Sequence, residues 1–86
     1  MPEICRFFGI VISMFYDDHD PPHFHATYGG KSAKISVKGL RVLEGKFSKR
    51  ALRLIKEWAK KNQKKLMEDW ELARHGKRPS KIQPLD

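Results

Sequence analysis

The first half of the chain consists of short apolar segments separated by glycine and proline. Apolar residues crowd residues 9–16, a pattern that predicts a strand covered on both faces. Pro21 and Pro22 cannot donate hydrogen bonds to a strand ladder, so they place a loop after this strand. The other strands predicted in this half span residues 23–28, residues 32–38 and, as a short fourth strand, residues 40–44.

The pair Gly29-Gly30 predicts a tight hairpin, because both positions of a type I′ turn need a positive φ. A turn of two residues pairs Phe24 with Ile35 and places His25 across from Lys34. One face of the hairpin is then apolar and is predicted to form the core: Phe24, Ala26, Tyr28, Ala33, Ile35 and Val37. The opposite face carries polar residues: His23, His25, Thr27, Lys34, Ser36 and Lys38.

The second half changes to helical periodicity. Ser48 is a suitable N-cap for a helix over residues 49–61, and a second helix is predicted over residues 63–75, before Gly76. The helices are expected to bury one apolar face against the hairpin residues Phe24, Ile35 and Val37. The residues on that face are Leu54, Ile55, Trp58, Leu66 and Trp70.

These elements predict one α+β domain over residues 1–86. We expect an antiparallel sheet of three or four strands over about residues 9–45, followed by two helices over about residues 48–75 that pack on one face. Residues 76–86 are predicted to form an irregular tail from which Ile82 and Leu85 can dock. If the helices left the sheet uncovered, a homodimer could bury it instead.

Composition narrows the class of protein. The chain has 86 residues with 18 Lys and Arg against 10 Asp and Glu, a formal charge of +8. No apolar run approaches the roughly 20 residues of a membrane-spanning helix, and the amino terminus lacks the basic-then-apolar order of a signal peptide. The single Cys5 cannot form an internal disulfide and is expected to be a buried apolar side chain. We therefore expect a cytoplasmic protein without a membrane partner.

Three histidines and three aspartates surround the proline loop. His23 and His25 are two positions apart on a predicted strand, so their rings project from one face with attachment points roughly 7 Å apart. His19 could complete a three-histidine set from the loop. Three imidazoles suit zinc or another borderline divalent ion. The carboxylates that could assist them are Asp17, Asp18 and Asp20.

The residue across from His25 leads to a different interpretation. Lys34 repels a dication, but with His23 and His25 it could hold a phosphate, aided by the hydroxyls of Thr27 and Ser36. His23, His25 and Lys34 would then be catalytic residues of a ribonuclease that requires no cofactor. A third interpretation is that the loop only forms a turn and the histidines only bind neighbouring strands. The sequence leaves these three interpretations open.

Basic residues concentrate in the second half of the chain. Residues 44–86 carry thirteen Lys and Arg against six Asp and Glu, whereas residues 1–43 carry five against four. Glu57 is the only acidic residue between Glu44 and Glu68. Such a positive surface binds phosphate backbones without reading sequence, and an acidic partner protein would suit the same field. The residues predicted to bind nucleic acid are Arg6, Lys49, Arg53, Lys56, Lys60 and Lys64.

Three segments carry a resemblance to a known family. They are Pro-Glu-Ile followed by Arg-Phe-Phe-Gly-Ile within residues 2–10, Asp-His-Asp-Pro-Pro-His-Phe-His-Ala at residues 18–26, and Lys-Ile-Gln-Pro-Leu at residues 81–85. Together they resemble the bacterial family called domain of unknown function 4160. The resemblance implies a compact cytosolic protein, often encoded beside another small protein in a pairing like that of toxin and antitoxin. It supplies no activity and no catalytic residue.

Our leading hypothesis joins the basic surface to this resemblance. It is a protein that binds RNA or another nucleic acid, or an acidic partner such as a cognate antitoxin, with the histidine-based ribonuclease chemistry described above. The alternative is a protein that binds zinc or another divalent metal through His19, His23 and His25.

Overall fold

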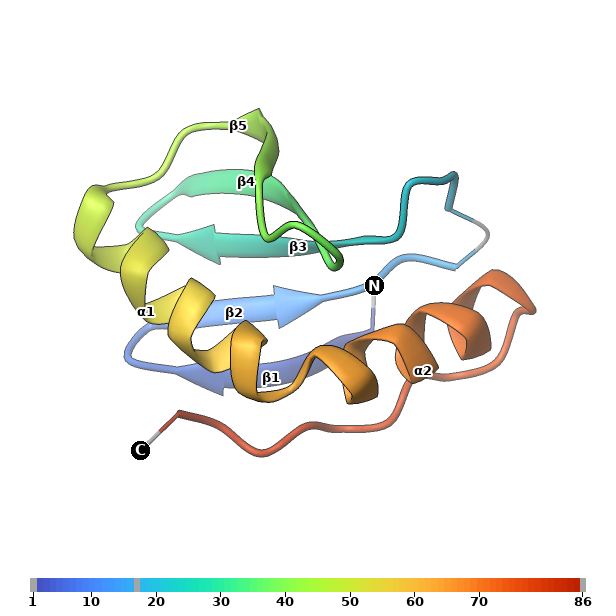
Figure 1. Cartoon of the computed structure of the whole chain (residues 1–86). Coiled ribbons are helices and arrows are strands. Elements are labelled where there is room, and N and C mark those ends of the chain that lie inside the picture. Colours follow the sequence, from blue (N-terminus) through green and yellow to red (C-terminus); the bar gives the residue numbers. More distant parts are fainter. Residues whose placement is uncertain (1, 17, 86) are drawn as a thin grey trace.

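The computed structural model describes residues 2–16 and 18–85, which form a five-stranded sheet with two helices on one face (Figure 1). Each strand pairs antiparallel with its neighbour in the chain. The predicted α+β class, with two helices after the sheet, is confirmed. The elements are β1 (Glu3–Phe7), β2 (Ile10–Ser13), β3 (His23–Tyr28), β4 (Lys31–Ser36), β5 (Val42–Gly45), α1 (Lys49–Lys61) and α2 (Gln63–Arg74).

The sheet has more strands than the three or four expected, because β1 does not show the alternation of a half-buried strand. Ile4 and Cys5 are both buried beside a shift in register between Glu3 and Cys5. Phe8 and Gly9 then form a turn with φ values of 49° and 80°, where the sequence pattern predicted the start of a strand. The bulge in the β1–β2 pairing therefore interrupts the alternation of apolar and polar residues by which a strand is recognised in a sequence.

The hairpin of β3 and β4 has the predicted register. Phe24 pairs with Ile35, and His25 pairs with Lys34. Both glycines of the connecting turn have a positive φ, as a two-residue turn needs. The ends of β4 and β5 differ by one or two residues from the expected 32–38 and 40–44.

The core lies between the sheet and the helices, with Trp58 of α1 near its centre. The Trp58 ring packs against Phe7 and Phe24, with ring centroids 5.4 Å and 6.0 Å away. Two predicted core residues differ: Leu54 is only half-buried, and Tyr28 is 42% exposed because it ends β3 at the hairpin tip. The largest fully buried side chains are Ile4, Ile10, Ile12, Met14, Phe24, Ile35, Val37, Ile55, Trp58, Leu66 and Trp70.

The helices begin and end close to the predicted positions. The Ser48 hydroxyl accepts the Ala51 N–H at 3.1 Å and caps α1. Asn62 separates the two helices, and its side-chain amide donates to the Trp58 carbonyl at 2.8 Å. Across residues 2–16 and 18–85, no helix is long and apolar enough to cross a membrane.

The irregular carboxyl-terminal segment lies along β1 (Figure 1). The Ile82 N–H donates to the Ile4 carbonyl at 2.8 Å, and the Trp58 indole N–H donates to the Gln83 carbonyl at 2.9 Å. Ile82 is buried and Leu85 is half-buried, so the predicted docking of this segment is confirmed.

Asp69 of α2 also holds this segment. Its Oδ1 accepts the Ser80 N–H at 2.9 Å, whereas its buried Oδ2 has no hydrogen-bond partner within the described ranges. Burial raises the pKa of the Asp69 carboxyl, the Ser80 N–H opposes this rise, and Glu68 adds to it. The ionised carboxylate is therefore less favourable in the folded protein than in the unfolded chain.

We expect Asp69→Ala to lower the free energy of unfolding by about 1–3 kcal/mol, because the Ser80 N–H loses its acceptor. Asp69→Asn keeps an acceptor oxygen and removes the charge, so its loss is smaller. The free energy of unfolding of Asp69→Asn, compared with wild type, should rise as the pH increases from below the ordinary aspartate pKa through the raised one. Urea unfolding at acidic and neutral pH measures both effects. Equal losses in the two variants would contradict this role, and Glu57→Ala, at an exposed position of α1, is the control.

Candidate functional site

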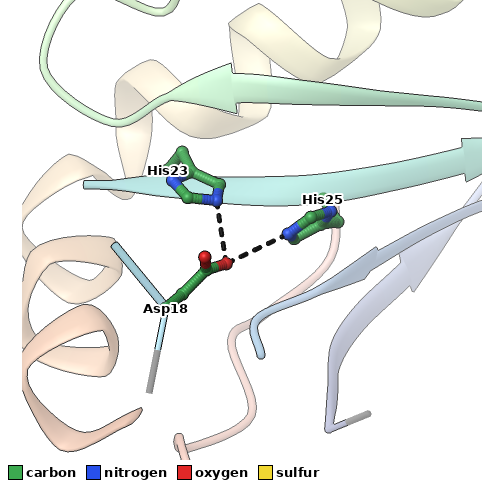
Figure 2. Close-up of side chains that lie close together, drawn as sticks. All are labelled: Asp18, His23 and His25. Carbon is green, nitrogen blue, oxygen red and sulfur yellow. Dashed lines mark hydrogen bonds and ion pairs between the residues drawn. The ribbon is translucent and has the colours of Figure 1, made fainter. Parts of the chain in front are cut away.

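Three side chains that can bind metals meet where the β2–β3 loop enters β3. Figure 2 shows Asp18, from the loop, between His23 and His25 of β3. The Asp18 Oδ2 lies 2.9 Å from Nε2 of His23 and 3.3 Å from Nε2 of His25. One ligand atom of each residue lies within 4.8 Å of those of the other two. We name these three residues the Asp-His-His cluster.

The backbone of β3 and of the loop brings the cluster together. His23 and His25 flank Phe24, whose side chain enters the core on the opposite face, and the two imidazole centroids are 5.2 Å apart. The His19 N–H donates to Oδ1 of Asp18 at 2.9 Å and so orients the carboxylate. The Asp20–Pro21 peptide bond in this loop is cis.

The hydrogen bonds of His23 determine what its buried Nε2 can do. Its Nδ1–H donates to the Pro21 carbonyl at 2.8 Å, since a carbonyl oxygen only accepts. A neutral ring then presents a lone pair at Nε2, which has no hydrogen-bond partner in the part of the chain that the structure describes. The Asp18 Oδ2, 2.9 Å away, is close but out of line for a hydrogen bond. Two acceptors at this distance need a positive group beside them, either a proton on Nε2 or a cation.

Aromatic side chains hold both imidazole rings. Phe15 stacks on His25 with ring centroids 3.9 Å apart and an interplanar angle of 13°, and Trp70 of α2 lies 5.2 Å from the His23 ring. Burial lowers the pKa of His25. The bond to Asp18 opposes this effect, and the nearby His23 and Lys34 add to it. The neutral imidazole, which is the form that binds metals, is therefore favoured at His25.

The carboxyl group of Asp18 favours its charged form. Burial alone would raise its pKa, but the His19 N–H and the His25 ring stabilise the carboxylate, and His23 adds to this. The resulting pKa is lower than that of an ordinary aspartate. The cluster thus combines a carboxylate with an imidazole that favours its neutral form, a combination that attracts a cation.

A cavity of about 320 Å³ opens beside the cluster. Its walls are formed by residues 18–21 of the loop, His23, Lys34 and the β5 residues Leu43 and Glu44. A small ligand can therefore approach Asp18 and His23 from solvent along this side.

The cluster differs in one member from the predicted three-histidine set. Asp18 is the third member, whereas the His19 side chain is exposed and lies outside the cluster. The reason is local: His19 contributes its backbone N–H to the Asp18 carboxylate instead of its ring to the cluster. Of the other carboxylates considered, Asp20 is exposed and Asp17 lies outside the described residues.

The residues of the predicted phosphate-binding face lie on one face of the hairpin, but several of them are engaged in other contacts. Lys34 lies across from His25 as expected, but its ammonium is 3.2 Å from a carboxylate oxygen of Glu44. The Ser36 hydroxyl accepts a backbone N–H of the turn before β5. The carboxylate of Asp18 occupies the position between the histidines where a phosphate would have to bind. The arrangement favours a cation over an anion.

Comparison with known families confirms the family that the sequence resembles. The family described as Domain of unknown function (DUF4160) matches residues 9–71, from the β1–β2 turn into α2, a range that includes the whole cluster. The chain belongs to the DUF4160 family. Searches of curated proteins and of solved structures give no match to this DUF4160 protein.

In this DUF4160 chain, four of the six residues predicted to bind nucleic acid lie on α1, which begins at the end of the sheet away from the start of β3, where the cluster lies (Figure 1). Lys64, on α2, is exposed as well. Arg6 lies apart from them on β1, where its exposed guanidinium donates to both carboxylate oxygens of Glu3, at 2.8 Å and 3.2 Å. We name as the basic face the four exposed residues Lys49, Arg53, Lys56 and Lys60.

Three groups around the cluster were not predicted as part of a site. Pro21 enters through its carbonyl, and its position two residues before His23 is the only signal in the sequence. In the sequence, Phe15 is typical of a strand residue and Trp70 of a core residue on a helix. Their contacts arise only when the loop folds back and α2 packs, so no local pattern could have identified them.

We expect Phe15→Ala to raise the pKa of His25 towards the ordinary histidine value, because loss of the stacked ring exposes the imidazole to water. An NMR titration of the histidine ring protons in chelator-treated protein measures this change. Tyr16→Ala removes a neighbouring exposed ring and is the matched control. If the His25 pKa stayed the same in Phe15→Ala, Phe15 would not be the group that buries it.

Proposed function

We propose that the protein binds one divalent cation, with zinc as the best fit, through Asp18, His23 and His25. The proposal rests mainly on the hydrogen bonding of the two ring nitrogens of His23. Its Nδ1–H is committed to the Pro21 carbonyl, and its Nε2 is buried without a hydrogen-bond partner among the residues described, beside the Asp18 carboxylate. A metal-bound histidine characteristically donates its second ring N–H to a carbonyl or carboxylate in this way.

The distances within the cluster support this proposal. Zinc binds imidazole nitrogen at about 2.0–2.1 Å in a tetrahedral arrangement, which separates neighbouring ligand atoms by about 3.3 Å. The two distances from the Asp18 Oδ2, 2.9 Å and 3.3 Å, are close to this value. The ligand atoms of the set all lie within 4.8 Å of one another, so small rotations of the side chains would close them on one ion.

The charge balance supports a cation as well. The cluster contains one carboxylate with a lowered pKa, and the positive charge of Lys34 nearby is paired with Glu44. The repulsion expected between Lys34 and a dication is reduced by this ion pair. Cleavage of RNA by His23, His25 and Lys34 without a metal is less well supported, because Asp18 lies between the two imidazoles.

Three protein ligands leave a fourth tetrahedral position for water or a substrate. Structural zinc sites have four protein ligands, whereas catalytic sites keep one position open. The cavity beside Asp18 and His23 gives solvent access to that position. Zinc held by these residues would lower the pKa of a bound water and so supply the chemistry of metal-assisted hydrolysis.

We expect protein purified without a histidine tag to bind one equivalent of zinc in isothermal titration calorimetry. Asp18→Ala and His25→Ala each remove a ligand, so each should weaken binding by more than the roughly 10–100-fold that loss of an outer-shell partner costs. The matched control is His19→Ala, which removes a histidine of the same loop that lies outside the cluster and should bind zinc as wild type does.

The pH dependence provides a second readout of the same experiment. Zinc competes with protons for the imidazoles, so the affinity should fall as the pH decreases, with release of protons on binding. Absence of zinc binding at neutral pH, or equal losses in His19→Ala and His25→Ala, would contradict the proposed site. Circular dichroism of each variant shows whether the fold is retained.

A second function is favoured by the basic face of α1: binding of RNA. Within the described ranges, no carboxylate lies within ion-pair distance of these four residues, and the only acidic residue of α1, Glu57, is 3.9 Å from Lys61 instead. An uncompensated positive surface of this kind attracts the phosphates of RNA. The pairing with an acidic partner such as an antitoxin stays a prediction from the family resemblance.

We expect the affinity for a generic RNA to fall steeply as the salt concentration rises, because each neutralised phosphate releases counterions. Lys56→Ala and Lys60→Ala should each reduce the slope of log affinity against log salt by about 1. Fluorescence anisotropy of labelled RNA measures the slope. Lys77→Ala, at an exposed position after α2, is the control. A slope that stays the same in all three variants would contradict binding by the basic face.

A further inference from the structure

A hollow of about 260 Å³ lies beside the β1–β2 turn and the start of α1. In Figure 1 these elements lie at the end of the sheet away from the start of β3, which carries His23 and His25 of the Asp-His-His cluster. The hollow is enclosed by the β1–β2 turn, the tip of the β3–β4 hairpin and the first turns of α1. Sites for drug-sized ligands measure roughly 300–1,000 Å³, so this hollow suits a single ring system. Its main lining residues are Phe8, Ile10, Tyr28, Ser48, Arg50 and Leu54.

Two aromatic rings are exposed at the mouth of the hollow. Phe8 is 59% exposed, and its φ of 49° lies in a region that a bulky side chain rarely adopts. Glycine or asparagine would suit this turn position better, so an exposed phenylalanine there costs stability without contributing to the core. Tyr28 is 42% exposed although its strand position faces the helices. Its ring packs against the backbone of Gly9 and lies 6.4 Å from Phe47, which holds it in place.

The charge around the hollow is positive. Arg50 lines it and is exposed, and no acidic residue occurs in the first turn of α1. Lys49 and Arg53 of the basic face are its neighbours on the helix. A ligand that matches both the rings and the charge is planar, apolar on its faces and attached to an anion.

We infer that this hollow binds one base of single-stranded RNA, stacked against Phe8 and Tyr28, while the adjoining phosphates contact Arg50 and the basic face. This inference rests on the second function proposed above and names the part of RNA that is recognised. Stacking of bases on aromatic side chains beside a positive groove is the general mode of single-strand binding. An acidic peptide would match the charge but offers no planar group for the two exposed rings. A duplex keeps its bases paired and stacked, so it cannot enter the hollow.

The experiment compares labelled single-stranded and double-stranded RNA by fluorescence anisotropy, over a range of salt concentrations and with chelator present. Tyr28→Ala removes one ring, and Phe8→Asn removes the other while suiting the left-handed backbone. Each should lower the affinity for the single strand by roughly five- to a hundred-fold. The salt slope should stay the same, because neither variant removes a charge. Tyr16→Ala is the matched control, since Tyr16 is also 42% exposed but does not line the hollow.

The outcomes separate this inference from the function on which it rests. Wild type could bind RNA with a steep salt slope while Tyr28→Ala and Phe8→Asn behave as Tyr16→Ala does. The inferred base site would then be wrong, but RNA binding by the basic face would still be supported. If wild type binds no RNA at low salt, both are wrong. Equal affinity for duplex and single strand, or a dependence on Phe8 and Tyr28 that is seen only with an acidic peptide, would also overturn the base site. Thermal unfolding confirms that each variant is folded, and Phe8→Asn provides the test should Tyr28→Ala fail to fold.

Discussion

The pairing of β3 with β4 is the constraint on which both faces of the sheet depend. The two-residue turn sets His25 across from Lys34 and Phe24 across from Ile35. Because side chains alternate along a strand, the register that turns Phe24 into the core also turns His23 and His25 to the opposite face. A shift of one residue would exchange these sets and place imidazoles against Trp58. The same hydrogen-bonded register therefore orients both the core side chains and the histidines of the candidate site.

In the part of the chain that the structure describes, two buried polar atoms without hydrogen-bond partners lie at the end of the core near the cluster. Folded proteins rarely leave buried polar atoms without partners. Among the residues described, Nε2 of His23 and the indole N–H of Trp70 both lack one, and their rings lie 5.2 Å apart. Leaving these atoms without partners costs stability, and local costs of this kind are typical of functional sites. A cation held by Asp18 and the two histidines would satisfy the first of these atoms.

The two proposed sites use different parts of the fold. The Asp-His-His cluster lies at the end of the sheet where the β2–β3 loop enters β3, whereas the hollow and the basic face lie at the hairpin tips and along α1. The sequence hypothesis had joined the histidines and the basic residues in one RNA-cleaving function. Because the two sites are separate in the structure, single-residue variants can test the proposed cation binding and the proposed RNA binding independently. Lys34 and Arg6 each form an exposed ion pair, Lys34 with Glu44 and Arg6 with Glu3.

The sequence by itself determined the β3–β4 hairpin, both helices and the basic residues on α1, because turn glycines, an N-cap serine and helical periodicity act over a few neighbouring residues. Tertiary structure decided the rest. It added β1, whose pairing passes through a bulge that breaks the alternation. It also chose Asp18 over His19 as the third member of the cluster. Several carboxylates and a histidine share that loop, and their spacing does not distinguish them. The direction of a loop side chain depends on hydrogen bonds such as those of the His19 N–H and the Pro21 carbonyl, which form only when the loop closes on β3.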